Sequence, residues 1–206
     1  MWEDIATERR ALADVFDELD ERQWDTPSLC GDWTVRELAA HLVMPFNVSL
    51  SRFGLTMLRY AGNFAKANIA LTAGLAGRPV AELVADYRAH AESHFTPPGM
   101  PPVTPLAEVL IHGQDARIPL GIGDTRAPEL WATALDFLVS PLGRRGFVTS
   151  RLPEVELIAT DAPWRAGSGP QVSGPAYAIG LTLTRRAPGL ESLSGAGRDT
   201  LAAWMG

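Results

Sequence analysis

The sequence has a single cysteine, Cys30, among 206 residues, so the chain cannot form an internal disulfide. This scarcity is typical of proteins that live in a reducing cytosol. Basic residues are also few: 18 Lys and Arg against 24 Asp and Glu give a net charge of −6, and no basic cluster stands out. A nucleic-acid groove needs such a cluster to neutralise phosphates, which argues against a nucleic-acid partner.

Long apolar runs are missing as well. Arg59 and Lys66 interrupt the only extended apolar region, and the first ten residues are too charged for a signal peptide. We therefore expect a cytoplasmic protein with no membrane partner. The hydrophobic content of 46% suits one well-filled core, or one domain with a small appendage. The sequence leaves the oligomeric state open, and a homodimer is one of the states it allows.

Residues 105–117 carry polar side chains within an apolar helical pattern. Glu108, His112 and Asp115 are four and three residues apart, which places all three on one edge of a helix. A carboxylate and an imidazole at this spacing can reach one ion, at roughly 2 Å each for zinc. The simpler alternative is a surface pair between Glu108 and His112. Two ligands of the usual three are thus predicted here, and the third has to come from another element.

Four amphipathic stretches predict a helical bundle, an arrangement that houses metals between facing helices. Thr34 and Glu37 form a capping-box pattern, so the second helix should start at Val35. His41 lies on the border of its apolar stripe, as a satisfied core residue or as a ligand. The other three helices are expected over residues 2–19, 80–96 and 104–120, with a fifth over 128–138 outside the bundle.

A second histidine pair, His90 and His94, also has metal-ligand spacing. We predict that the third helix ends at Pro97 and Pro98, which puts both histidines in its last turn. The helix dipole favours a cation there, so this pair is either a helix-end feature or a rival ligand pair.

The composition changes beyond Gly143. Apolar and acidic residues alternate over 155–159 and predict a short strand, followed by a loop over 161–174 that is rich in Gly, Pro and Ser. Two further helices are expected, one ending at Leu183 and one over 199–205. We therefore divide the chain into a helical bundle over residues 1–143 and a short α+β extension over 144–206, packed on the bundle.

Two motifs can be compared with known proteins: the run Trp24–His41 and the run Glu108–Asp115. Together they resemble the mycothiol-dependent maleylpyruvate isomerase family, part of the DinB-like metal-binding superfamily. The resemblance implies a mainly α fold, a DinB-like four-helix bundle. It also implies a divalent metal, in most members zinc, bound by His41, Glu108 and His112.

The resemblance extends more weakly into the tail. The family's C-terminal domain contributes an arginine to the active site, and the segment 181–186 is similar to the part that carries it, with Thr184 in place of a glycine. Arg185 or Arg186 would take this role. The implied function is a mycothiol-dependent isomerase or S-transferase that acts on a small electrophilic substrate.

Three protein ligands would leave zinc with an open position, as in catalytic sites. A thiol bound there would lose its proton and could add to an electrophilic carbon. Asp115 would orient a ligand histidine or a bound water, and the tail arginine would bind a substrate carboxylate.

Two other classes of function remain. The same ligands could activate water in a metal-dependent hydrolase, or the metal could only stabilise a non-catalytic bundle used for protein association. The second case would need a fourth protein ligand, with four candidates: Cys30, His90, His94 and Asp115. We interpret Cys30 as a small buried residue.

Overall fold

The computed structural model describes residues 1–123, 126–148 and 150–206. Within these ranges the chain forms two compact units, which we describe separately. The N-terminal unit contains residues 2–95 and 112–123. The C-terminal unit contains Met1, residues 96–111 and the described residues that follow 123. No helix in the described ranges is both long enough and apolar enough to cross a membrane.

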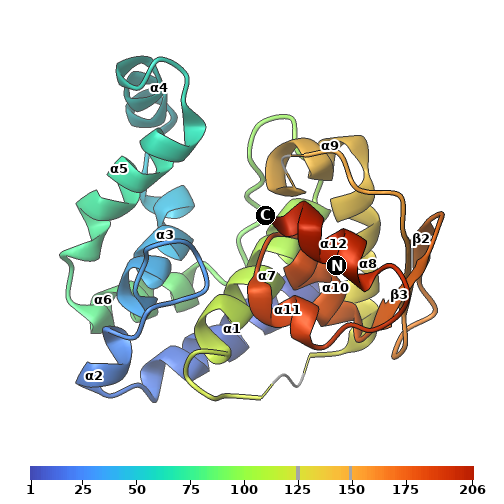
Figure 1. Cartoon of the computed structure of the whole chain (residues 1–206). Coiled ribbons are helices and arrows are strands. Elements are labelled where there is room, and N and C mark those ends of the chain that lie inside the picture. The colour runs from blue at the N-terminus through green and yellow to red at the C-terminus, as the bar shows by residue number, and fades with distance from the viewer. Residues whose placement is uncertain (124–125, 149) are drawn as a thin grey trace. The chain divides into compact units, whose positions relative to one another are not determined.

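The N-terminal unit is entirely helical. Helix α6 packs against both α1 and α3, and α3 also packs against α5. In Figure 1, α4 lies at the end of this unit that is remote from α1 and α2. The unit also includes the second half of α7. The helices are α1 (Trp2–Asp17), α2 (Glu21–Trp24), α3 (Val35–Asn47), α4 (Leu50–Arg59), α5 (Phe64–Ala76), α6 (Val80–Ala89) and α7 (Val103–Arg117).

The start of α3 follows from its capping box. The Glu37 amide donates to Thr34 Oγ1 at 3.3 Å, and the Thr34 amide donates back to Glu37 Oε2 at 2.8 Å. The predicted start at Val35 is therefore confirmed. Because the cap fixes the first turn, it also fixes which side chains of α3 enter the core, Leu38 among them.

The predicted end of the third helix is wrong: α6 ends at Ala89, well before the two prolines. The guanidinium of Arg9 explains the early end, because Nη1 donates to the carbonyls of His90, Ala91 and Ser93 at 3.4, 3.2 and 2.8 Å. These carbonyl oxygens thus accept hydrogen bonds from a side chain of α1, whereas in a longer α6 they would accept from backbone amides of the helix itself. His90 and His94 consequently do not share a last helical turn.

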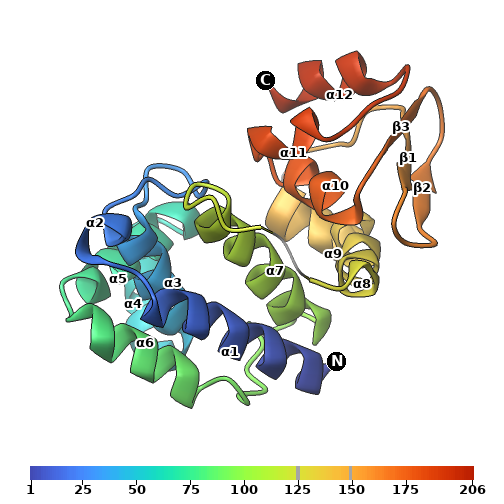
Figure 2. The same cartoon turned by 90° about the horizontal axis from the view of Figure 1, so that it is seen from below.

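The C-terminal unit combines helices with a small sheet (Figure 2). In the sheet, β1 is central, antiparallel to β2 and parallel to β3. Helix α8 packs against α10, where a side chain at Gly180 would come within 2.6 Å of the Trp131 ring. The elements are α8 (Pro128–Val139), α9 (Pro141–Gly143), η1 (Arg144–Val148), β1 (Glu156–Ala159), β2 (Arg165–Gly167), β3 (Gln171–Gly174), α10 (Ala176–Leu183), α11 (Ala187–Glu191) and α12 (Arg198–Met205).

Most of the predicted elements of the tail are present. The strand over 155–159 corresponds to β1, and the two predicted helices correspond to α10 and α12. The segment 161–174 is not only a loop, because it contains β2 and β3. These strands are three and four residues long, at or below the lower limit of the four- to eight-residue runs by which a strand is recognised in a sequence.

Two leucines test the packing of the N-terminal unit. Leu38 of α3 is fully buried, whereas Leu58 of α4 is 79% exposed. We expect Leu38→Ala to lower the free energy of unfolding by about 2–5 kcal/mol, since it leaves a cavity in the core. The same change at Leu58 should alter it by less than about 0.5 kcal/mol. Denaturant titrations of the two variants measure both values, and equal losses would contradict the exposure of α4.

Candidate functional site

A tight loop precedes α3 and approaches α7. The Ser28 amide donates to the Trp33 carbonyl at 2.8 Å, and the Trp33 amide donates to the Cys30 carbonyl at 3.3 Å. Gly31, at the tip, has a φ of +61°, a conformation that costs side-chain-bearing residues steric strain. The Leu29 amide donates to the Asp115 carbonyl at 3.0 Å. The loop is therefore fixed to α7 through the main chain.

Two histidines meet at this place. The rings of His41 on α3 and His112 on α7 are 5.0 Å apart in an edge-to-face arrangement. Trp33 is on the loop that precedes α3, and the centre of its indole lies 4.9 Å from the centre of the His41 ring. The structure thus brings together two of the three predicted ligands, although they are far apart in the sequence.

Asp115 supports His112 from one helical turn further on. Its carboxylate is fully buried, and Oδ2 lies 2.9 Å from Nδ1 of His112, whose side chain is 12% exposed. A histidine held at Nδ1 has its other ring nitrogen, Nε2, left for a ligand. Asp115 therefore contacts His112, and its role in orienting that ring toward a metal ion stays a prediction.

The protonation of His112 follows from these contacts. Burial alone would lower its pKa, but hydrogen bonds with Asp115 and Cys30, and the charges of both, outweigh burial and raise the pKa of His112 to about 10. These contacts favour the protonated form of the ring, paired with the Asp115 carboxylate. A metal ion that binds the ring has to replace a proton on it.

Cys30 joins the same cluster. The thiol sulfur, a ring nitrogen of His112 and a carboxylate oxygen of Asp115 all lie within 4.8 Å of one another. Sulfur, imidazole nitrogen and carboxylate oxygen are the donors that zinc takes in proteins, so this set fits a zinc-like divalent ion. Our interpretation of Cys30 as a small buried residue is wrong, because the residue is partly exposed and lies beside His112.

The remaining predicted site residues lie elsewhere on the chain. Glu108 is on α7, one turn before His112 and on the same edge of that helix. Arg185 and Arg186 follow α10 in the C-terminal unit. Arg185 donates to the Met205 carbonyl and to Ser150 Oγ, and its guanidinium lies 4.6 Å from the centre of the Trp204 ring.

Comparisons with known proteins identify the family of one part of the chain. Residues 5–96, which include the loop and His41, match the model of the mycothiol maleylpyruvate isomerase N-terminal domain. Residues 5–96 therefore belong to this family. The resemblance to this family is thereby confirmed, although only the first of the two motifs lies within the matched residues and Glu108–Asp115 follows them.

Two solved structures share the fold of this family. One is a histidine-to-alanine variant of the mycothiol-dependent maleylpyruvate isomerase, with a TM-score of 0.62 and 18% identity over 95% of this chain and 93% of that chain. The other, titled as the mycothiol-dependent maleylpyruvate isomerase, has a TM-score of 0.57 and 15% identity over the same shares. The search of curated proteins gave no match. The prediction of a mainly α, DinB-like fold with a short α+β extension is confirmed.

The rival histidine pair has other partners within the isomerase-family domain. The ring of His90 stacks on Phe46 at 4.7 Å, and the ring of His94 stacks on Trp2 at 4.4 Å. His90 Nδ1 also lies 3.0 Å from Asp86 Oδ1. Each ring is thus held by a different aromatic neighbour, and neither histidine belongs to the donor cluster around His112.

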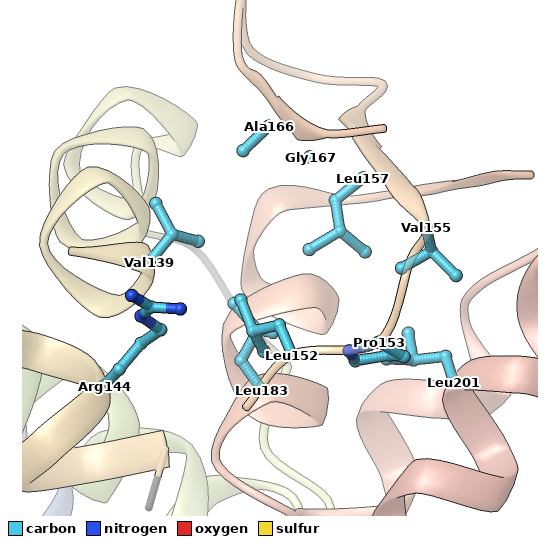
Figure 3. A pocket seen from close by; sticks show the side chains of 10 residues that line it. All are labelled: Val139, Arg144, Leu152, Pro153, Val155, Leu157, Ala166, Gly167, Leu183 and Leu201. Carbon is cyan, nitrogen blue, oxygen red and sulfur yellow. The ribbon is translucent and has the colours of Figure 1, made fainter. Parts of the chain in front are cut away.

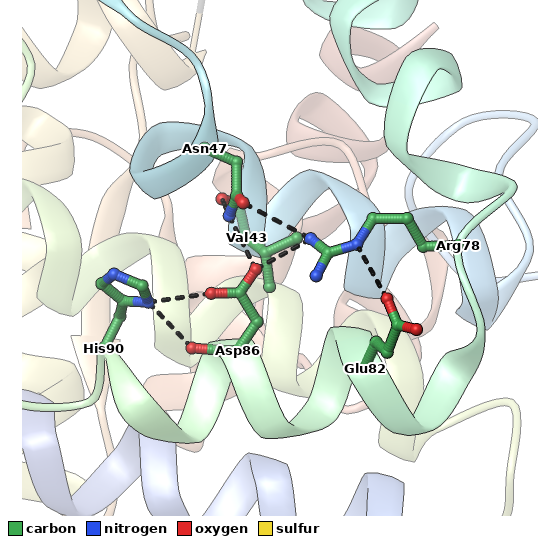
Figure 4. A network of polar contacts seen from close by, with 6 residues as sticks. All are labelled: Val43, Asn47, Arg78, Glu82, Asp86 and His90. Atoms are coloured by element: carbon green, nitrogen blue, oxygen red, sulfur yellow. Dashed lines mark hydrogen bonds and ion pairs between the residues drawn. The ribbon is translucent and has the colours of Figure 1, made fainter.

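Asp86 is the centre of a polar network (Figure 4). Its Oδ2 accepts hydrogen bonds from Arg78 Nη1 and Asn47 Nδ2, both at 2.8 Å. Burial alone would raise the pKa of Asp86, but these bonds and the charges of Arg78 and His90 lower it below the usual 3.8. The network joins α3, α6 and the turn before α6, and so supports the helix that carries His41.

A cavity of about 300 Å³ lies in the C-terminal unit, outside the family match. Figure 3 shows its apolar walls with Arg144 at one side. None of the predicted ligands or catalytic residues lines it.

The Asp86 network predicts a pH-dependent contribution to stability. A carboxyl with a lowered folded-state pKa stabilises the fold above its unfolded-state pKa, and this contribution is lost as the pH falls through the folded-state value. Asp86→Asn should thus cost about 1 kcal/mol at neutral pH and progressively less below pH 3.8. Glu82→Gln is the control, because Glu82 is 61% exposed and its ion pair with Arg78 is worth little. Melting temperatures across pH test this, and a pH-independent cost would contradict it.

Proposed function

We propose that this chain is a metal-binding, mycothiol-dependent isomerase or S-transferase that acts on a small electrophilic substrate. One divalent ion, with zinc as the favoured metal, would be bound by His41, Glu108 and His112. The observation that carries the proposal is the meeting of the His41 and His112 rings, with Asp115 held behind His112. The family of the domain and the names of the two similar structures support the thiol as cosubstrate.

The ligand set rests on different kinds of support. His41 and His112 contact each other, and the Asp115 carboxylate fixes the orientation of the His112 ring. Glu108 is proposed from its position one turn before His112, a spacing at which two side chains of a helix can reach one ion. A set of two imidazoles and one carboxylate is typical of catalytic zinc sites with an open position.

The chemistry divides between the ion and the residues around it. When bound, the ion would hold the sulfur of a thiol cosubstrate in its deprotonated form. Asp115 keeps the Nδ1 proton of His112 in place, so that Nε2 stays available as a ligand atom. That sulfur would add to one carbon of a substrate carbon–carbon double bond. Rotation about the resulting carbon–carbon single bond, followed by departure of the sulfur, would restore the double bond in the other geometry and complete an isomerisation. Protonation of the neighbouring carbon, with the carbon–sulfur bond kept, would make the reaction an S-transfer.

Of the two tail arginines, we propose Arg186 as the group that binds a substrate carboxylate. Arg185 adopts a φ of +64°, the conformation that a glycine would favour, whereas Thr184 has a φ of −99°. The glycine–arginine pair of the resemblance therefore corresponds better to Arg185 and Arg186 than to Thr184 and Arg185. Arg185 also holds the C-terminal helix through the Met205 carbonyl, which suits a structural role.

The proposed metal ligands can be tested by measuring the metal content of purified variants. We expect one divalent ion per chain in the purified protein after reconstitution with zinc, and loss of that ion in His41→Ala and in His112→Ala. His90→Ala is the control, because the ring of His90 stacks on Phe46 and pairs with Asp86. Metal analysis of the three variants measures the content. Full occupancy in the first two together with loss in the third would show that the wrong histidines were chosen.

The thiol dependence can be tested by absorption spectroscopy. Replacement of zinc by cobalt gives the site a visible spectrum, and we expect mycothiol to change it because its sulfur would bind the ion. A free thiol titrates near 8.5, so binding as a thiolate at neutral pH requires the ion. The change should be absent in His112→Ala. If no cellular thiol alters the spectrum and turnover of electrophilic substrates is the same without thiol, a metal-dependent hydrolase or a non-catalytic bundle replaces the proposal.

A further inference from the structure

Cys30 lies beside His112, one of the three proposed ligands of the metal ion. Its sulfur is within 4.8 Å of both the His112 ring nitrogen and the Asp115 carboxylate oxygen. The three donor residues lie in the same compact unit, so their proximity is a property of that unit alone.

The main chain holds Cys30 in this position. Its amide donates to Ser28 Oγ at 3.1 Å, and the same hydroxyl donates to the Trp33 carbonyl at 2.7 Å. The neighbouring residue, Leu29, is bonded through its amide to the carbonyl of Asp115. A sulfur on so constrained a loop is already near its partners, so coordination would cost little conformational entropy.

We propose that Cys30 is a fourth, displaceable protein ligand of the metal ion, released when the thiol cosubstrate binds. This inference rests on the proposed metal site. The resting site would be closed by sulfur, two imidazoles and one carboxylate, all common zinc ligands. In the exchange, one sulfur–metal bond forms and one breaks, and the proton lost by the incoming thiol passes to the Cys30 sulfur. No atom is oxidised or reduced.

This arrangement has a regulatory consequence. The internal sulfur competes with every external ligand for one position, so weak ligands such as water stay out. A thiol cosubstrate can displace Cys30 because its own sulfur takes the place of the Cys30 sulfur on the ion. Removal of the Cys30 sulfur should therefore weaken the binding of the metal and strengthen the binding of mycothiol to the metal-loaded protein.

The experiment compares the cobalt-substituted full chain with two variants, Cys30→Ser and His112→Ala, before any thiol is added. We expect a sulfur-to-cobalt charge-transfer band in the unmodified protein and none in Cys30→Ser. His112→Ala is the control, because it keeps the only sulfhydryl of the chain but removes the site. Metal affinity in Cys30→Ser should fall by more than the roughly 10- to 100-fold lost with groups that only orient a ligand. The dissociation constant of mycothiol should decrease in that variant.

A measurement on the unmodified protein avoids dependence on the folding of variants. X-ray absorption of the zinc-loaded protein should show one sulfur neighbour at about 2.3 Å, and addition of mycothiol should leave the number of sulfur neighbours unchanged. A metal-loaded protein without a sulfur neighbour would overturn the role of Cys30 and leave the metal site standing. A charge-transfer band that persists in His112→Ala would also overturn it. Failure of the unmodified protein to bind cobalt or zinc would instead overturn the proposed function itself.

Discussion

A buried carboxylate is the constraint on which the site depends. Asp115 has no exposed surface, and the removal of such a charge from water costs several kcal/mol unless a partner compensates it. His112 is that partner, one helical turn away on α7. The pair fixes the position of the imidazole, and this position determines which side chains lie beside the ring, His41 and Cys30 among them.

Patterns in the sequence predicted the structure correctly where all the residues of the pattern lie on one helix. The capping box of Thr34 and Glu37 gave the first residue of α3, and the spacing of His112 and Asp115 gave their contact, since both depend only on helix geometry. The end of α6 could not be predicted in this way. It is set by Arg9, a residue about 80 positions earlier in the chain whose guanidinium binds carbonyls beyond Ala89. Long-range contacts of this kind leave no periodic pattern.

Cys30 illustrates the same limit within the candidate site. Nothing in the sequence distinguishes a single cysteine in a short loop from a residue that only packs. In addition, 82 positions separate Cys30 from His112. One local signal was available: Gly31 and Asp32 favour a turn directly before a capped helix that carries His41. That signal indicates a loop folded close to α3, but the hydrogen bond from Leu29 to Asp115 that brings Cys30 to α7 is visible only in three dimensions.

The attachment of this loop has a consequence for how the site can change. Leu29 is joined to Asp115 by main-chain atoms alone, and the turn that follows is closed by main-chain bonds and the Ser28 hydroxyl. The side chain at position 30 takes no part in these bonds. The backbone of the loop is therefore held independently of the side chain at position 30, beside His112. A substitution there would change the chemical group presented next to His112 while the hydrogen bonds that fix the loop stay in place.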